Sequence, residues 1–108
     1  MYTLIEMAKE VEIEETLLPN GAIRFLAINN KGEIVGSAFV GKEYPRFIMQ
    51  VNPHYQDKGI GRRLLAGANN YLPYGVVGEF NPEPGKGYKL QKFYERMGFK
   101  IIEGQVVK

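Results

Sequence analysis

Two absences narrow the chemistry open to this chain of 108 residues: it has no cysteine, and its only histidine is His54. Without cysteine there is no disulfide, no thiolate ligand for a metal and no cysteine nucleophile. A single histidine cannot supply the group of imidazole ligands on which many zinc sites depend. We therefore expect no metal in the functional site, and chemistry that depends on other side chains or on the backbone.

Long apolar runs and strong charge are absent as well. No stretch approaches membrane-spanning length, and the start of the chain lacks a basic region followed by an apolar one, so we expect a cytoplasmic protein without a membrane partner. The formal net charge of +2 is far from that of a dedicated nucleic-acid-binding protein. One basic helix face is expected to lack interleaved exposed aromatic residues, which argues against a nucleic-acid partner. That face comprises Lys86, Lys89, Lys92, Arg96 and Lys100.

The composition that remains, 44% hydrophobic and 24% charged residues, is typical of one globular domain spanning 1–108. We divide it into an N-terminal part, about 1–46, and a second part, about 47–108. The N-terminal part is predicted to start with a short helix or irregular segment up to about Glu10. Turn signals then separate three strand-like runs, which predicts an antiparallel meander. The three runs are 11–18, 22–29 and 33–40.

The second part is organised around Phe47–Leu72. Phe47–Val51 is an apolar run predicted as a buried strand, and the residues after Gly59 place apolar side chains on one helix face. A strand, a glycine-containing turn and a helix N-terminus form an arrangement that binds phosphate, because the free N–H groups point at the anion. Arg62 and Arg63 follow the glycines, where the helix dipole disfavours positive charge unless a bound polyanion offsets it.

After this helix, the pattern predicts a strand at 76–80, a loop at 81–87, a helix ending at Gly98 and a last strand at 100–103. The helix before 76–80 makes a crossover, so that strand and 47–51 should be parallel neighbours with a ligand at their carboxyl ends. The order predicts an α+β fold: a mixed, mostly antiparallel central sheet with a β-α-β crossover and helices on both faces.

Three phosphate-loop patterns bear on the glycines at positions 59 and 61. The dinucleotide fingerprint G-x-G-x-x-G fails because Leu64 stands in place of the third glycine, and no G-x-x-x-x-G-K-[ST] sequence occurs. The third pattern, Q/R-x-x-G-x-G/A, is matched by Gln56–Gly61. This hexapeptide resembles the loop that holds the pyrophosphate of coenzyme A in the GNAT superfamily of acyl-CoA-dependent N-acyltransferases.

Other segments resemble the same family. Val51-Asn52-Pro53 is similar to the end of the family's preceding strand, and Leu64-Leu65 to its apolar helix. Asn81 stands at the end of the next strand, where the family usually has an asparagine. The block 93–99, FYERMGF, is similar to the family's helix that ends in an aromatic pair and a glycine-phenylalanine. The resemblance covers roughly the C-terminal half and implies a GNAT-like fold in a compact, N-terminally short member.

The resemblance implies transfer of an acetyl or other acyl group from acetyl-CoA to an amine, by direct attack in a ternary complex. It implies Tyr94 as the general acid for the leaving thiolate, and a backbone N–H around Val51 for the charge on the carbonyl oxygen. From strand alternation, Glu79 shares a face with Asn81 and is the first candidate for the base. The implied coenzyme contacts are Val51, Gln56, Asp57, Lys58, Gly59, Ile60, Gly61, Arg62 and Asn81.

Several alternatives stay open. His54 is a second candidate base, with Glu43 and Tyr44 as outside candidates. The segment 82–87 looks like an insertion relative to the family, and the N-terminal part is shorter than usual, so the acceptor site is either more open or completed in a homodimer. The acceptor is expected to be a small-molecule or peptide amine. The alternative to an enzyme is a module of the same fold that binds acyl-CoA without turnover.

Overall fold

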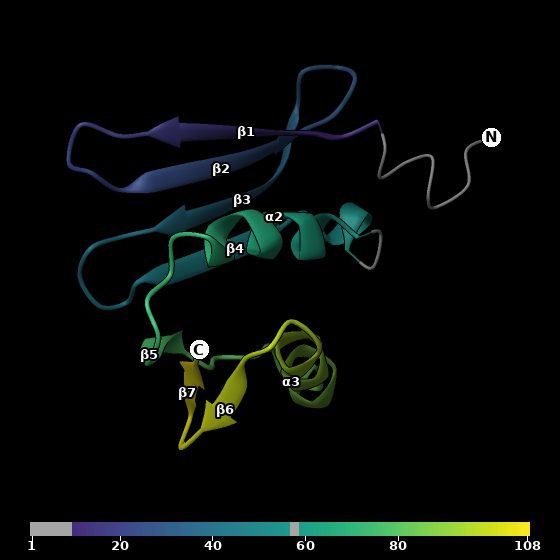
Figure 1. Cartoon of the computed structure of the whole chain (residues 1–108). Coiled ribbons are helices and arrows are strands. Elements are labelled where there is room, and N and C mark those ends of the chain that lie inside the picture. Colours follow the sequence, from purple (N-terminus) through teal and green to yellow (C-terminus); the bar gives the residue numbers. More distant parts are fainter. Residues whose placement is uncertain (1–9, 57–58) are drawn as a thin grey trace.

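The computed structural model describes residues 10–56 and 59–108, so most of the segment predicted as an N-terminal helix lies outside the described residues. The α+β class is confirmed: strands form two sheets, and one helix packs on each (Figure 1). The strand orders are β1-β2-β3-β4 and β5-β7-β6. The elements are β1 (Glu12–Leu17), β2 (Ile23–Ile28), β3 (Ile34–Val40), β4 (Phe47–Val51), the 3₁₀ turn η1 (Pro53–Tyr55), α2 (Ile60–Asn69), β5 (Val76–Glu79), α3 (Gly87–Arg96), β6 (Lys100–Ile102) and β7 (Gln105–Val107).

The first sheet is the predicted meander, and each of its strands lies within one residue of its expected bounds. Local turn chemistry fixes the order of the strands. In the β2–β3 turn the side-chain oxygen of Asn29 accepts hydrogen bonds from the backbone N–H groups of Lys31, at 3.0 Å, and Glu33, at 2.9 Å. Gly32 takes a φ of 80°, which other residues rarely adopt. The residues that make these contacts are close in sequence, which is why the turn signals in the sequence predict the meander well.

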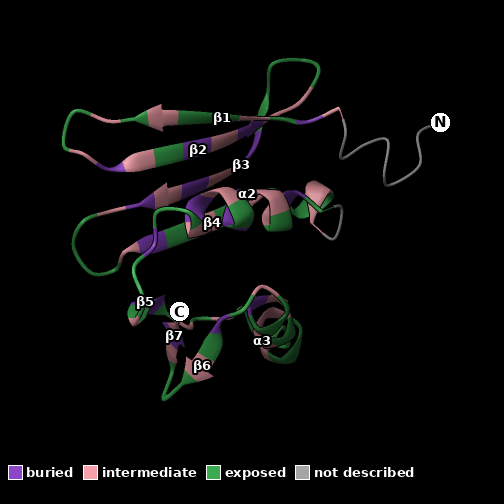
Figure 2. Cartoon of the chain, in the orientation of Figure 1, coloured by how far each residue is buried: buried purple, intermediate pink, exposed green. Residues whose placement is uncertain are grey.

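The core lies between the first sheet and α2, and Figure 2 shows the buried residues gathered there. Gly67 allows the helix to approach the sheet, because a Cβ at that position would lie 2.9 Å from the ring of Phe25. The contact buries apolar side chains from both sides, and this burial is the main source of stability for the helix. The buried residues of this contact are Phe25, Ala27, Ala38, Ile60, Leu64, Leu65 and Ala68.

The second sheet contains a strand that the sequence pattern did not reveal. Glu103 (φ 49°) and Gly104 (φ 75°) form a tight turn, after which β7 runs back antiparallel between β6 and β5. α3 packs against β6, and its carboxyl end is closed as predicted. The N–H groups of Gly98 and Phe99 donate to the carbonyls of Glu95 and Tyr94, the pattern of a Schellman cap.

The predicted parallel ladder between β4 and β5 is not formed, so the single mixed sheet is divided into two antiparallel sheets. The strands meet only where they begin. The N–H of Arg46 donates to the carbonyl of Val77 at 2.7 Å, and a Cβ on Gly78 would lie 3.2 Å from the carbonyl oxygen of Phe47. The prediction was wrong: β5 pairs with β7 on one edge, whereas its backbone contact toward β4 is the bond from Arg46 to Val77, beyond which the two strands separate. We call the region beyond this contact, between the carboxyl ends of β4 and β5, the fork.

The helices found within 10–56 and 59–108 are too short or too polar to cross a membrane.

Candidate functional site

The edge of β4 that faces the fork carries backbone groups without a ladder partner. Gly36 lies opposite Val51, and the N–H of Asn52 donates to the carbonyl of Val35 at 2.8 Å. In an antiparallel ladder this makes Gly36 and Val51 a non-hydrogen-bonded pair, so the N–H and C=O of Val51 point away from β3. The same alternation turns the N–H and C=O of Met49 outward. Among the described strands none pairs with this edge of β4.

The loop after β4 folds back onto the strand. The 3₁₀ turn is started by Asn52, whose side-chain oxygen accepts a hydrogen bond from the N–H of His54 at 2.9 Å. Gln56 then returns to β4, because its side-chain amide donates to the carbonyl of Val51 at 3.1 Å. Two of the predicted coenzyme contacts, Gln56 and Val51, are therefore brought together. Asp57 and Lys58 lie outside the described residues.

The N-terminus of α2 lies beside this loop and has no side-chain cap. Gly59 occupies the N-cap with φ 83°, and the first backbone bond within the helix runs from the N–H of Arg63 to the carbonyl of Gly59. The N–H groups of Ile60, Gly61 and Arg62 precede that bond and therefore have no partner within the helix. Such a terminus carries partial positive charge and is suited to an anion.

The two arginines behind the glycines have different environments. Arg62 is exposed and makes no hydrogen bond or ion pair with another residue in the described part of the chain. The guanidinium of Arg63 turns away and donates to the carbonyl of Val11 at 2.7 Å, joining α2 to the segment before β1. Arg62 is thus available for a ligand, whereas Arg63 has a structural contact that the sequence pattern did not reveal.

Tyr94 lies on α3 within an aromatic group and is 9% exposed. Its ring packs edge-on against Phe93, at 5.6 Å between centroids, and Phe99, at 6.1 Å. No described residue hydrogen-bonds to its hydroxyl, which is also not among the fully buried polar atoms without a partner. The hydroxyl therefore keeps contact with solvent or a ligand. Burial raises the pKa of Tyr94 above the ordinary tyrosine value, which keeps the hydroxyl protonated at neutral pH.

Glu79 and Asn81 follow each other at the carboxyl end of β5, on the other side of the fork. The side-chain amide of Asn81 donates to a carboxylate oxygen of Glu79 at 3.0 Å, and both residues are exposed. They share one face, as strand alternation predicts. The hydrogen bond fixes the direction of the carboxylate.

A further residue joins the loop, and sequence reasoning names it only as part of the basic helix face. The ammonium of Lys86, at the N-cap of α3, lies 3.0 Å from the carboxylate of Glu83 and 3.5 Å from the side-chain oxygen of Gln56. The segment 82–87, which looks like an insertion, therefore reaches the glycine-containing loop. A signal was present in the sequence, because a basic residue at the end of a Pro/Gly-rich loop precedes the α3 helix.

Two of the remaining candidate bases are remote from the fork, and the third lies in the loop that follows β4. Glu43 and Tyr44 are exposed in the β3–β4 connection, at the opposite end of β4 from Val51. A strand of five residues is roughly 17 Å long, so these side chains are remote from the fork. His54 is exposed on the 3₁₀ turn. Of the candidates, Glu79 is the one that the structure places at the carboxyl end of β5.

The arrangement consists of an uncapped helix terminus, an unpaired strand edge and a protonated tyrosine. It can hold a phosphate group at one end and an extended, amide-containing chain along β4. No group of three or more potential metal ligands occurs among the residues that the structure describes.

These features define an α+β protein with a glycine-containing turn before an uncapped helix, and comparison with known families gives the family. Residues 21–101 match the model of the Acetyltransferase (GNAT) domain, so the chain belongs to this family. The match runs from just before β2 to β6 and confirms the resemblance seen in the sequence. Its members are described as acetyltransferases, so the class of chemistry is acyl transfer. No curated protein and no solved structure matches the chain.

Proposed function

We propose that the protein transfers an acetyl or other acyl group from acyl-CoA, most often acetyl-CoA, to an amine on a small molecule or peptide. The observation that carries this proposal is the unpaired edge of β4 next to the uncapped N-terminus of α2. The pantetheine arm of coenzyme A contains two amides and the adenosine end carries a pyrophosphate. One strand edge and one helix terminus, lying side by side, offer partners of matching chemistry for both.

The binding contacts follow from this arrangement. The N–H groups of Ile60, Gly61 and Arg62 donate hydrogen bonds to the pyrophosphate, and the Arg62 guanidinium adds a charge-assisted contact. Gln56 holds the loop against β4 through the carbonyl of Val51. Asp57, Lys58 and Gly59 complete the loop, and Asn81 faces the ligand from β5. The outward N–H and C=O groups of Met49 hold the arm by strand addition, which leaves the N–H of Val51 for the reacting carbonyl.

The reaction forms a bond between the amine nitrogen and the acyl carbon and breaks the bond between that carbon and sulfur. The N–H of Val51 stabilises the negative charge that develops on the carbonyl oxygen. The amine must lose a proton, which passes to Glu79 directly or through water. Asn81 orients that carboxylate through the 3.0 Å hydrogen bond. Because the two substrates are held side by side, positioning supplies much of the rate.

Tyr94 assists the leaving thiolate. Its pKa is raised by burial, whereas an ordinary thiol has a pKa of about 8.5. The tyrosine is therefore the weaker acid, and it stabilises the thiolate mainly by donating a hydrogen bond until the thiolate takes up a proton from solvent and becomes the free thiol. This role needs the hydroxyl and not the ring.

The alternative is a module that binds acyl-CoA without turnover. One observation favours this module: Glu79, the candidate base, is exposed and already accepts a hydrogen bond from Asn81, so it is a weak candidate for taking a proton from the amine. Both functions use the same binding contacts, so they differ only in turnover.

A titration followed by a turnover assay tests the proposal. Coenzyme A and acetyl-CoA should raise the melting temperature, and a panel of amines should then give release of free thiol. Tyr94→Phe should lower the rate by about a hundredfold while binding is kept, and Tyr88→Phe, an exposed tyrosine of the same helix, should have no effect. Absence of stabilisation at millimolar coenzyme A would overturn both functions. Stabilisation without thiol release from any amine would favour the binding module.

A further inference from the structure

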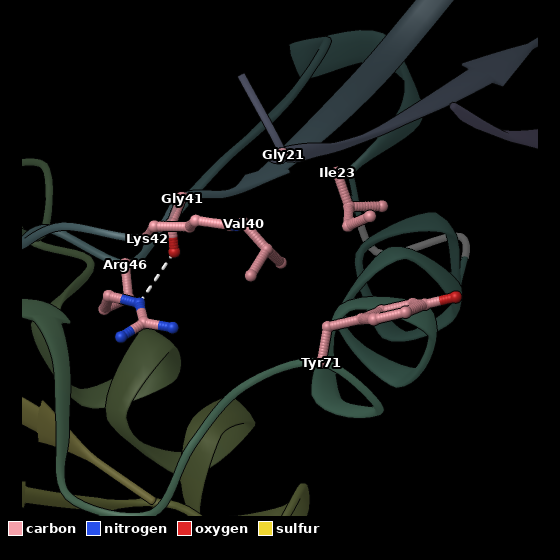
Figure 3. A pocket seen from close by; sticks show the side chains of 7 residues that line it. All are labelled: Gly21, Ile23, Val40, Gly41, Lys42, Arg46 and Tyr71. Carbon is pink, nitrogen blue, oxygen red and sulfur yellow. Dashed lines mark hydrogen bonds between the residues drawn. The ribbon is translucent and has the colours of Figure 1, made fainter. Parts of the chain in front are cut away.

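A second concave site lies at the far end of α2 from the glycine-containing loop. It has a volume of about 160 Å³ and lies between the first sheet and the segment that follows the helix (Figure 3). Tyr71 follows the carboxyl end of α2, and a helix of ten residues is roughly 15 Å long. The pocket is therefore separate from the proposed coenzyme site and has no part in the proposed function.

One wall of this pocket is apolar. Ile23 begins β2 and Val40 ends β3, and both side chains point to the same face of the sheet as the core. Figure 3 shows these two side chains facing the ring of Tyr71 across the space. The ring is held by its hydroxyl, which hydrogen-bonds to the carboxylate of Glu15 on β1. An apolar ligand body of a few carbons would contact aliphatic and aromatic surface here.

The other wall is cationic. The Nε of Arg46 donates to the carbonyl of Gly41 at 2.7 Å, which fixes the guanidinium and leaves its terminal nitrogens for a further acceptor (Figure 3). Lys42 reaches the same wall, because a Cβ on Gly21 would lie 2.7 Å from its ammonium nitrogen. Within 10–56 and 59–108, neither the terminal nitrogens of Arg46 nor the ammonium of Lys42 has an acceptor.

Among the described residues some lysines have protein acceptors and others, such as Lys31 and Lys100, have none, so what distinguishes Lys42 is its place beside Arg46 and the apolar wall. Lys86 and Lys92 pair with glutamates on the same loop or helix, and Lys108 donates to two backbone carbonyls. Two cations without protein acceptors, beside an apolar wall, suit a ligand that is anionic at one end and apolar at the other. The Glu15 carboxylate at the hydroxyl of Tyr71 disfavours a negative group on that side, so the anion belongs at the Arg46 side.

We propose that this pocket binds a small carboxylate with a short apolar body. A guanidinium whose terminal nitrogens are open makes paired hydrogen bonds to a carboxylate, and Lys42 adds a second charge. A volume of about 160 Å³ corresponds to roughly five water molecules, which fits a ligand of about seven heavy atoms such as 3-methylbutanoate. Ile23, Val40 and Tyr71 contact its branched end.

Titration of the ¹⁵N-labelled full chain, followed by its amide resonances, tests the proposal. The probes are 3-methylbutanoate, the neutral isostere 3-methylbutanamide, acetate and inorganic phosphate. We expect saturable shifts at Gly21, Gly41 and Arg46 with 3-methylbutanoate, and affinities at least about tenfold lower for the other three probes. Coenzyme A in the same spectra should instead shift Gly59 and Gly61, so failure of one site is distinguishable from failure of the other.

A matched pair of variants tests whether the positive charge of Lys42 contributes to binding of the carboxylate. Lys42→Gln should weaken 3-methylbutanoate about tenfold, whereas Lys31→Gln, an exposed lysine in the β2–β3 turn, should leave its affinity unchanged. The proposal is overturned by absence of saturable shifts at tens of millimolar, by equal binding of the amide, by tighter binding of phosphate, or by an unchanged affinity in Lys42→Gln.

Discussion

The two ends of α2 differ in how their backbone groups are satisfied. At the carboxyl end, the ammonium of Lys108 donates to the carbonyl of Asn69 at 2.9 Å and to that of Leu72 at 2.7 Å. The hydroxyl of Tyr71 adds a contact to Glu15 on β1. At the amino end, Gly59 supplies no capping side chain, and no acidic residue occurs in the first turn.

The contrast separates a structural terminus from a binding terminus. Capping and acidic residues at a helix N-terminus usually contribute stability, and their absence here has a cost. An anionic ligand can offset that cost, which agrees with acyl transfer from a phosphate-bearing donor. Substitutions at the amino end should therefore change the affinity for coenzyme A, whereas substitutions at the carboxyl end should change stability and leave that affinity unchanged.

Charge reversal at Arg62 should give the largest difference between affinity and stability. In Arg62→Glu the affinity for coenzyme A should fall about a hundredfold, because a charge-assisted contact is lost and a repulsive one is gained. The same change should raise the free energy of unfolding by about 0.5 kcal/mol, since a negative charge in the first turn favours the helix dipole. Calorimetric titration and chemical denaturation measure the two effects.

Lys31→Glu is the matched control for that experiment, because it makes the same change of charge in the exposed β2–β3 turn. It should leave coenzyme affinity within about twofold of the wild type. Equal losses in both variants would mean that net charge, and not the terminus of α2, attracts the ligand.

Gly59→Ala should lower both the stability of the protein and its affinity for coenzyme A. Its φ of 83° is strained for alanine, so the free energy of unfolding should fall by about 1 kcal/mol and the first turn should shift. Coenzyme affinity should fall with it. Gly32→Ala imposes the same strain at φ 80°, also with open space around the added Cβ, and should cost similar stability without affecting the ligand. A normal coenzyme affinity in Gly59→Ala would contradict a binding role for this turn.

The elements at the amino end of α2 could be predicted because their signals are local. Phe47–Val51 is a continuous apolar run and Ile60 opens a helical repeat, so β4 and α2 begin at the expected residues. The strand β7 could not be found, because it is three residues long and depends on a turn with positive φ at Glu103. Its pairing with β5 depends on contacts between segments that are distant in sequence.

Contacts between residues distant in sequence also limited what could be predicted about the candidate site. Sequence reasoning selected Gln56 and Tyr94 by resemblance, but the environment of each is tertiary. Gln56 meets Lys86 across 30 residues, and Arg63 reaches Val11 across 52. No local pattern distinguishes the paired Arg63 from the available Arg62, since both follow the same two glycines.

Loss of the cap at the carboxyl end should be a pure stability effect. Lys108→Met removes two hydrogen bonds from the ammonium to the carbonyls of Asn69 and Leu72, which should lower the free energy of unfolding by about 1 kcal/mol. Coenzyme affinity should not change. Lys100→Met, an exposed lysine of β6, should leave stability within about 0.5 kcal/mol of the wild type. A change of coenzyme affinity in Lys108→Met would remove the distinction between the two ends.

The smallest effect is expected at Tyr71, and it depends on pH. A hydrogen bond to Glu15, with smaller contributions from desolvation and from the charge of Glu15, raises the pKa of Tyr71 above the ordinary value of about 10. Because the folded state holds this proton to a higher pH than the unfolded state, its contribution to stability is complete below about pH 10 and is lost as the pH rises through the raised pKa.

Tyr71→Phe should therefore show a shallower loss of stability between about pH 9 and 11 than the wild type, measured from urea midpoints. Tyr94 also has a raised pKa and remains in the variant, so part of the alkaline loss should persist. Tyr74→Phe, an exposed tyrosine three residues further along, is the control and should follow the wild-type curve. An identical slope in Tyr71→Phe would show that the contact with Glu15 does not hold the carboxyl end of α2 in solution.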